Sequence, residues 1–161
     1  PIIAYGGGSK AAAERAARLG MMFFPQTTDP MMAVFYDEEA ERVGNPTGLT
    51  MGPSQGAPTT VFLAESLDQG WEQFGPYMLH DAVSYRGWMG KDNNSASLSQ
   101  ASSVAELREE NGPYRIVTPK QAVELIKTYQ TLSLQPLCGG VPPDLAWSSL
   151  SLIEKQVLPF C

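Results

Sequence analysis

Apolar and polar positions at the beginning of the chain follow the order strand, turn, helix. The apolar run 1–5 leads into the glycine-rich turn 6–9, and an alanine-rich segment, 10–19, comes next. A second apolar run, 21–24, follows directly. Two strands joined by one short helix lie parallel, because such crossovers are right-handed in nearly all proteins. The pattern therefore predicts an α/β fold, with a further helix over residues 30–43.

The middle of the chain, residues 45–117, is predicted to be an insertion between such units. A loop rich in Gly, Pro and Thr, 45–58, precedes an apolar strand, 59–64, and a helix with apolar positions at helical spacing. Residues 91–103 are polar and rich in serine and asparagine, so we expect a mobile surface segment there. The insertion ends with a short helix and an extended stretch, 114–117.

The final segment repeats the order of the beginning. Thr118-Pro119-Lys120-Gln121 is a capping-box pattern with proline at the first helical position, which is typical of the start of a helix. The short apolar run Leu134–Leu137 is predicted to be a strand and residues 138–140 a turn. A helix should then run from Pro142 to Val157.

The composition is that of an ordinary globular protein, with 43% hydrophobic and 17% charged residues. No apolar run approaches the roughly 20 residues that a membrane-spanning helix needs. The net charge of -6 argues against nucleic acid as a partner. Cys138 and Cys161 lack the spacing of metal ligands, and a single histidine cannot complete a His/Cys zinc cluster. We expect two free thiols in a cytoplasmic protein that binds neither nucleic acid nor membrane.

The turn Gly6-Gly7-Gly8-Ser9 is the strongest candidate for chemistry. Three glycines between a strand and a helix expose backbone N–H groups beside the positive end of the helix, which is a way to hold phosphate without a dedicated cation. The alternative is a tight turn with no ligand, because the motif is neither the dinucleotide-binding fingerprint nor a P-loop.

Several segments in sequence order resemble the luciferase-like monooxygenase family. The resemblance is carried by the run that ends in Gly6-Gly7-Gly8-Ser9, by the Ala-Ala-Arg-Leu-Gly that ends at Gly20, and by further stretches: Phe23-Phe24-Pro25, Val61–Ser66, Thr118-Pro119, Pro142–Trp147 and Val157–Pro159. In order and spacing it spans nearly the whole chain. The resemblance departs at Met21-Met22, where many relatives carry Asp-Gly. This difference affects the detailed shape of the cofactor pocket and leaves the predicted strand unchanged.

The resemblance implies the carboxy-terminal part of a TIM-like (β/α)8 barrel, about the last three βα units with a long insertion. A complete barrel usually has about 250 residues. Because this chain has 161 residues and opens at Pro1 inside an apolar run, we interpret it as a fragment or a processed chain. The single partial-barrel domain would comprise two βα units in 1–44, the insertion 45–117, and a last helix, strand and helix in 118–161.

The resemblance also implies a flavin cofactor, either flavin mononucleotide (FMN) or a deazaflavin coenzyme, that exchanges a hydride or electrons with a small organic substrate or with oxygen. The glycine turn and the end of the next strand would hold its phosphate: Gly6, Gly7, Gly8, Ser9, Phe24 and Pro25. The catalytic residues are unknown, because the family's first five strands are absent from the sequence. We therefore expect this chain to be inactive on its own.

Two further residues are candidates for contact with substrate. His80 precedes Asp81, and histidine is the side chain that titrates near neutral pH. Adjacent residues of a helix point in different directions, however, so a structural or rim position for His80 is the competing interpretation. Cys138 ends the predicted last strand, but neither a second cysteine nor a histidine lies near it in the sequence to activate its thiol.

Two other functions compete with a flavin-dependent oxidoreductase. One is a half-barrel that binds partners and performs no chemistry, and the other is a different enzyme with a phosphate-bearing ligand, because a fold does not fix a function. Three strands cut from a barrel would leave unpaired edges. The predicted partners are therefore the missing N-terminal half of the barrel or a second copy in a dimer.

Overall fold

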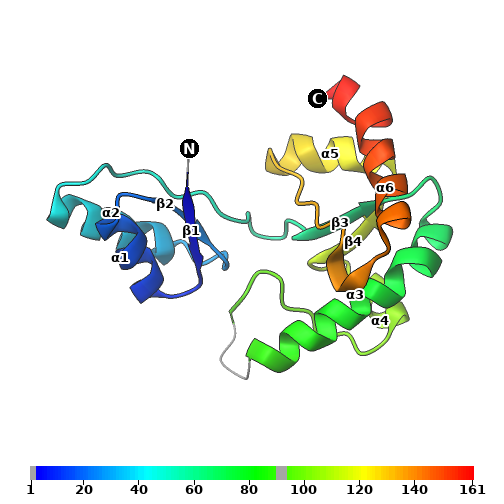
Figure 1. The fold of residues 1–161 in the computed structure, drawn as a ribbon, viewed down its shortest axis with the longest axis horizontal. Coiled ribbons are helices and arrows are strands. Elements are labelled where there is room, and N and C mark those ends of the chain that lie inside the picture. The colour runs from blue at the N-terminus through cyan, green and yellow to red at the C-terminus, as the bar shows by residue number, and fades with distance from the viewer. Residues whose placement is uncertain (1–2, 90–93) are drawn as a thin grey trace. The chain divides into compact units, whose positions relative to one another are not determined.

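The computed structural model describes residues 3–89 and 94–161, so Pro1 and Ile2 of the predicted first strand lie outside the described residues (Figure 1). The described chain divides into two compact units. The N-terminal unit comprises the residues up to Gln55 together with 94–96, and the C-terminal unit comprises the residues from Gly56 onward except 94–96. Each unit has its own sheet.

The N-terminal unit has two parallel strands that alternate with two helices. They are β1 (Ala4–Gly7), α1 (Lys10–Arg18), β2 (Met22–Pro25) and α2 (Met31–Val43). The register of the strands runs from the Ala4–Met22 pair to the Gly7–Pro25 pair, so both strands end at the same edge of the sheet. The strand–helix–strand order and the parallel pairing agree with the apolar pattern of residues 1–24.

Small side chains let α1 pack closely in this unit. Ala13, Ala16 and Ala17 are fully buried and share a core cluster with Phe23 and Tyr36. The Tyr36 hydroxyl donates a hydrogen bond to the Met21 carbonyl at 2.9 Å, so the buried ring keeps its polar group paired. The alanine spacing that the sequence shows is therefore the buried face of α1.

Glu39 of α2 forms two ion pairs, one with Arg42 of the same helix and one with Arg18 of α1. Its carboxylate accepts hydrogen bonds from Arg42 at 2.6 Å and from Arg18 at 2.7 Å, and only 9% of its side chain is exposed. The hydrogen bond from Arg42 and then that from Arg18 lower the pKa of Glu39 to about 2. The carboxylate is therefore charged throughout the neutral and mildly acidic range.

We expect the N-terminal unit to lose stability as the pH falls from about 5 to about 2. The folded pKa of Glu39 lies below its ordinary value of 4.5, so the stabilisation is complete above that value and is lost as the carboxylate becomes protonated. Thermal denaturation across this pH range should show a weaker pH dependence for Glu39→Gln. Glu38→Gln, at the exposed neighbouring position, is the control. Identical pH profiles for Glu39→Gln and the parent would contradict the assignment.

The C-terminal unit places a second pair of parallel strands between helices (Figure 1). Its elements are β3 (Thr60–Leu63), α3 (Leu67–Met89), α4 (Val104–Glu110), β4 (Tyr114–Val117), α5 (Pro119–Tyr129) and α6 (Pro143–Gln156). Side chains alternate between two core clusters, with Phe62 and Ile116 on one face of the sheet and Leu63 and Val117 on the other. Both faces are thus covered, as is usual for parallel strands.

The prediction of a TIM-like (β/α)8 barrel is wrong. The described strands form two separate two-stranded sheets, β1–β2 and β3–β4, instead of one continuous curved sheet. The predicted last strand, Leu134–Leu137, does not form: Leu134 makes one isolated bridge to Val61, and a 3₁₀ turn occupies Cys138–Gly140. Strands β3 and β4, which fall within the predicted insertion, instead build the second sheet.

Part of the polar segment predicted to be mobile packs against the protein. Residues 91–93 lie outside the described residues. Farther along, Ser99 and Ala101 are buried, and the Ser99 hydroxyl donates to the carboxylate of Glu110.

In the described part of the chain no helix is both long enough and apolar enough to cross a membrane.

Candidate functional site

The glycine turn lies between the end of β1 and the start of α1. Ser9 is the N-cap of α1, and its Oγ accepts a hydrogen bond from the Ala12 N–H at 3.3 Å. The first N–H groups of a helix have no partner within the helix, and they carry its positive dipole end. The first turn of α1 contains no acidic side chain that would compete for these groups. This end of α1 is therefore suited to an anion.

The other predicted cofactor residues lie beside this turn. In the register of the sheet, Gly6 is opposite Phe24 and Gly7 is opposite Pro25. The N–H of Gln26, just past β2, donates to the Gly7 carbonyl at 3.0 Å. Phe24 is 42% exposed, whereas Pro25 is buried. The structure therefore gathers the predicted cofactor residues at one edge of the β1–β2 sheet.

The three glycines of the turn have different structural roles. A Cβ added to Gly7 would lie 2.5 Å from the Ala12 Cβ, so the close approach of α1 requires glycine there. A Cβ on Gly6 or Gly8 would meet nothing closer than 3.9 Å, and neither residue has a positive φ. Packing among the described residues does not require glycine at 6 or 8, but a ligand that approaches the backbone closely would.

A short segment far away in the sequence also lies at this edge. The Ala96 N–H donates to the Gln26 carbonyl at 2.8 Å. The Asn94 Oδ1 is 3.9 Å from the position of a Cβ on Gly8. Lys10, in the first turn of α1, adds a positive charge and lies 4.8 Å above the Phe35 ring. The sequence analysis did not include Asn94, which no motif links to the turn, or Lys10, which directly follows the turn.

His80 and Cys138 belong to the C-terminal unit, whereas the glycine turn belongs to the N-terminal unit. His80 is exposed on α3, while its neighbour Asp81 is partly buried and accepts a hydrogen bond from the Tyr114 hydroxyl at 2.7 Å. Burial, and then the Asp81 carboxylate, raise the pKa of Cys138 to about 12. Its thiol therefore stays protonated at neutral pH, which does not suit a nucleophile.

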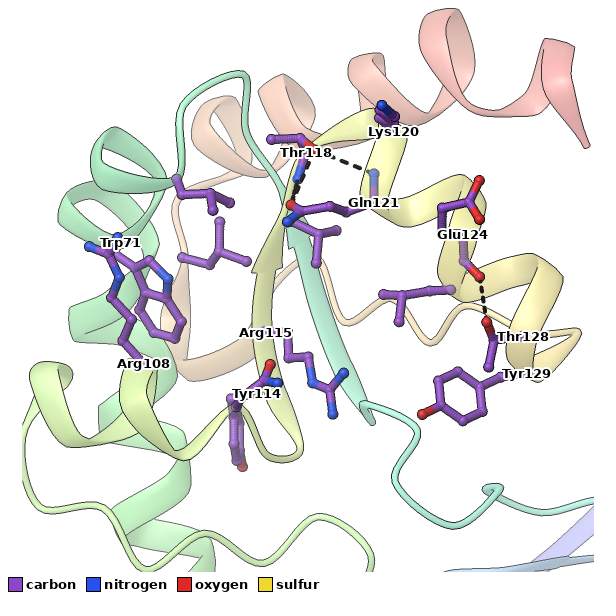
Figure 2. A pocket seen from close by; sticks show the side chains of 15 residues that line it. Trp71, Arg108, Tyr114, Arg115, Thr118, Lys120, Gln121, Glu124, Thr128 and Tyr129 are labelled. Atoms are coloured by element: carbon purple, nitrogen blue, oxygen red, sulfur yellow. Dashed lines mark hydrogen bonds between the residues drawn. The ribbon is translucent and has the colours of Figure 1, made fainter.

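A cleft of about 780 Å³ opens in the C-terminal unit (Figure 2). Helix α5 provides one wall with Gln121, Glu124 and Tyr129, and Trp71 and Arg108 lie on the opposite side. Strand β4 forms the floor. The sequence pattern identified Thr118–Gln121 only as a helix start and gave no sign of a cleft.

Among the described residues, no group of three or more His, Cys, Asp or Glu side chains could hold a metal ion.

The comparisons with known proteins find a likeness of fold only. No known protein family matches the sequence, and no curated protein matches it. Among solved structures, the chain is similar to the crystal structure of monooxygenase RslO1 from Streptomyces bottropensis, with a TM-score of 0.52 and 20% sequence identity. The match covers 95% of this chain and 46% of that chain, so the present chain spans less than half the length of its structural neighbour.

Proposed function

We propose that this chain is part of a flavin-dependent oxidoreductase of the luciferase-like type, in which the glycine turn holds the phosphate of FMN or of a deazaflavin coenzyme. The resemblance of the sequence supports the family and the cofactor. The likeness of fold to a monooxygenase supports an oxidative enzyme. The observation that carries the proposal is the presence of glycine at positions 6 and 8, because the packing around them leaves room for a side chain and does not require glycine.

The residues present fit a phosphate group. Backbone N–H groups at the start of α1, next to a turn without side chains, match the way in which parallel α/β folds hold phosphate. Lys10 contributes a positive charge, and its ion pair with Glu14 is long, at 3.8 Å. Phe24, partly exposed at the end of β2, supplies an apolar surface beside the turn. The site thus combines an anion-binding end with an aromatic ring.

In this proposal the chain positions the cofactor and contributes no named catalytic residue. A bound flavin supplies two-electron transfer to a small organic substrate. The turn fixes the phosphate end, and Phe24 and Pro25 limit the space at the neighbouring strand end. A phosphate-binding turn alone provides only part of the contact area of a cofactor site. We therefore expect flavin binding by this chain to be weak and its activity to depend on residues beyond it.

Fluorescence titration with FMN and with riboflavin, which lacks the phosphate, tests the proposal. The parent chain should bind FMN more tightly than riboflavin, and Gly8→Val should weaken FMN binding about tenfold, because a side chain at this position blocks the backbone. Gly8 is a better position than Gly7, where a side chain would collide with Ala12.

Gly87→Val is the matched control for this titration. A Cβ at Gly87 would meet nothing within 4 Å, just as a Cβ at Gly8 would meet only the Asn94 Oδ1 at 3.9 Å, and Gly87 is exposed on α3. This variant should bind FMN like the parent. Equal affinities of the parent for FMN and riboflavin, or an unchanged FMN affinity in Gly8→Val, would remove the phosphate-site assignment.

A further inference from the structure

The cleft of the C-terminal unit follows the free edge of its sheet. All four residues of β4, from Tyr114 to Val117, line the cleft, whereas no residue of β3 does. Successive side chains of a strand point to opposite faces of a sheet. A cleft that touches every residue of one strand therefore lies along the edge of that strand rather than over one face.

Buried backbone groups of β4 point into this cleft. The Thr60 N–H donates to the Pro113 carbonyl, and the Ala64 N–H donates to the Val117 carbonyl. Because bonding directions alternate along a strand, Tyr114 and Ile116 direct their N–H and C=O groups away from β3. Among the described residues, no backbone group outside the β3–β4 pair forms a hydrogen bond with the N–H or C=O of Tyr114 or Ile116. Both residues are at least 94% buried, and such polar groups are normally paired.

The walls of the cleft extend beyond the β4 edge on both sides (Figure 2). Leu125 and Tyr129 of α5 line one wall, and Leu67 and Trp71 of α3 line the other. Neighbouring strands of a sheet lie about 4.8 Å apart. A further strand beside β4 would thus have its two faces covered by α5 and α3, as the faces of β3 and β4 are covered.

The charges along the cleft indicate the character of the occupant. The Arg115 guanidinium donates to the carbonyls of Gly112 and Gly56, at 3.0 and 2.9 Å. Neither Arg115 nor Lys120 forms an ion pair with a carboxylate among the described residues. Two unneutralised cations at one cleft contrast with the net charge of -6 of the whole chain. They favour an occupant with acidic side chains.

We propose that this cleft accepts an extended, acidic peptide segment as a third strand beside β4. Backbone hydrogen bonds to Tyr114 and Ile116 would provide the pairing, and carboxylates near Arg115 and Lys120 would select the sequence. Strand addition of this kind takes its affinity from the main chain and its specificity from alternate side chains. The inference rests on the C-terminal unit alone and is independent of the flavin proposal.

The probe is a fluorescein-labelled synthetic peptide of about eight residues that alternates glutamate and valine, followed by fluorescence anisotropy. We expect saturable binding to the parent chain. A peptide of the same sequence with N-methyl groups on alternate amides cannot donate the same backbone hydrogen bonds. Its affinity should therefore be lower by a factor of about ten or more. A peptide that alternates lysine and valine should not bind, because its positive charges would be repelled by those of Arg115 and Lys120.

Two tryptophan variants test the location. Thr128 lines the cleft from α5 and its hydroxyl donates to a carbonyl of its own helix, so Thr128→Trp should fill the slot and abolish binding. Ser148 donates similarly within α6 but is exposed and outside the cleft, so Ser148→Trp should bind as the parent does. Circular dichroism checks that both variants fold.

Several results would overturn the proposal. Absence of binding to the acidic peptide at millimolar concentration would exclude a strand-accepting slot. Equal binding of the N-methylated peptide, or full competition by glutarate at the same carboxylate concentration, would identify simple charge attraction instead. Equal loss of affinity in Thr128→Trp and Ser148→Trp would move the binding site away from β4.

Discussion

Gly139→Ala is expected to destabilise the C-terminal unit by about 3 kcal/mol or more, because a side chain there adds overpacking to an unfavourable backbone conformation. A Cβ at this position would lie 1.9 Å from the Tyr77 carbonyl oxygen and 2.6 Å from its carbonyl carbon. The φ of Gly139 is 61°, in the left-handed region. The obstacle is the backbone of α3, which cannot move aside as a flexible side chain can. Urea denaturation followed by circular dichroism measures the loss.

The neighbouring Gly140 provides the control for this experiment. Its φ of 84° is also positive, but a Cβ there would meet nothing within 4 Å. Gly140→Ala should therefore lower the free energy of unfolding by about 1 kcal/mol, the cost of a positive φ alone. Similar losses in the two variants would show that the contact between Gly139 and Tyr77 is not the reason for glycine at position 139.

Phe62→Ala is expected to cost the C-terminal unit about 3–5 kcal/mol. Phe62 is 1% exposed at the centre of β3, and its ring stacks on Phe74 of α3 with centroids 4.5 Å apart. Removing the ring leaves a cavity between the sheet and the longest helix of the unit, which close packing around it cannot fully close. Thermal and urea denaturation of the parent and the variant provide the measurement.

Phe160→Ala tests whether burial is the cause of this loss. Its side chain is 71% exposed, so the same change in chemistry should alter the free energy of unfolding by no more than about 0.5 kcal/mol. If Phe62→Ala were as mild as Phe160→Ala, the cluster around Phe62 and Phe74 would not be the core of the unit.

Local signals in the sequence predicted individual elements well. The capping box at Thr118 forms as expected, with the Thr118 and Gln121 side chains each bonded to the backbone of the other. The alanine-rich run 10–19 forms the predicted helix, and Ala13, Ala16 and Ala17 make up its buried face. Such features depend on residues three or four positions apart, which the sequence displays directly.

The pairing of strands could not be obtained in the same way. Thr60 pairs with Tyr114 across a long intervening segment, and no local pattern specifies that partnership. The apolar run at Leu134 resembled a strand, but it makes only one bridge before the chain turns at Cys138. The apolar pattern gave the order of the elements, whereas the family resemblance implied that their strands share one barrel sheet, which the two separate sheets contradict.

The candidate sites show the same division between local and distant information. The residues of the glycine turn are contiguous, and Phe24 and Pro25 follow from the parallel pairing of the next strand. Asn94 reaches that edge from a distant segment without a sequence motif. The cleft beside β4 depends on three helices and a strand edge, and an unpaired edge becomes visible only when the sheet is known.

The contrast between the two cysteines has a practical consequence for labelling. Cys138 is buried with a raised pKa, whereas Cys161 is exposed. Maleimide reagents react with accessible thiolates, so at neutral pH they should modify the folded chain selectively at Cys161. A dye or spin label can thus be attached to the native sequence at one defined position, without replacing Cys138 and disturbing the core around it.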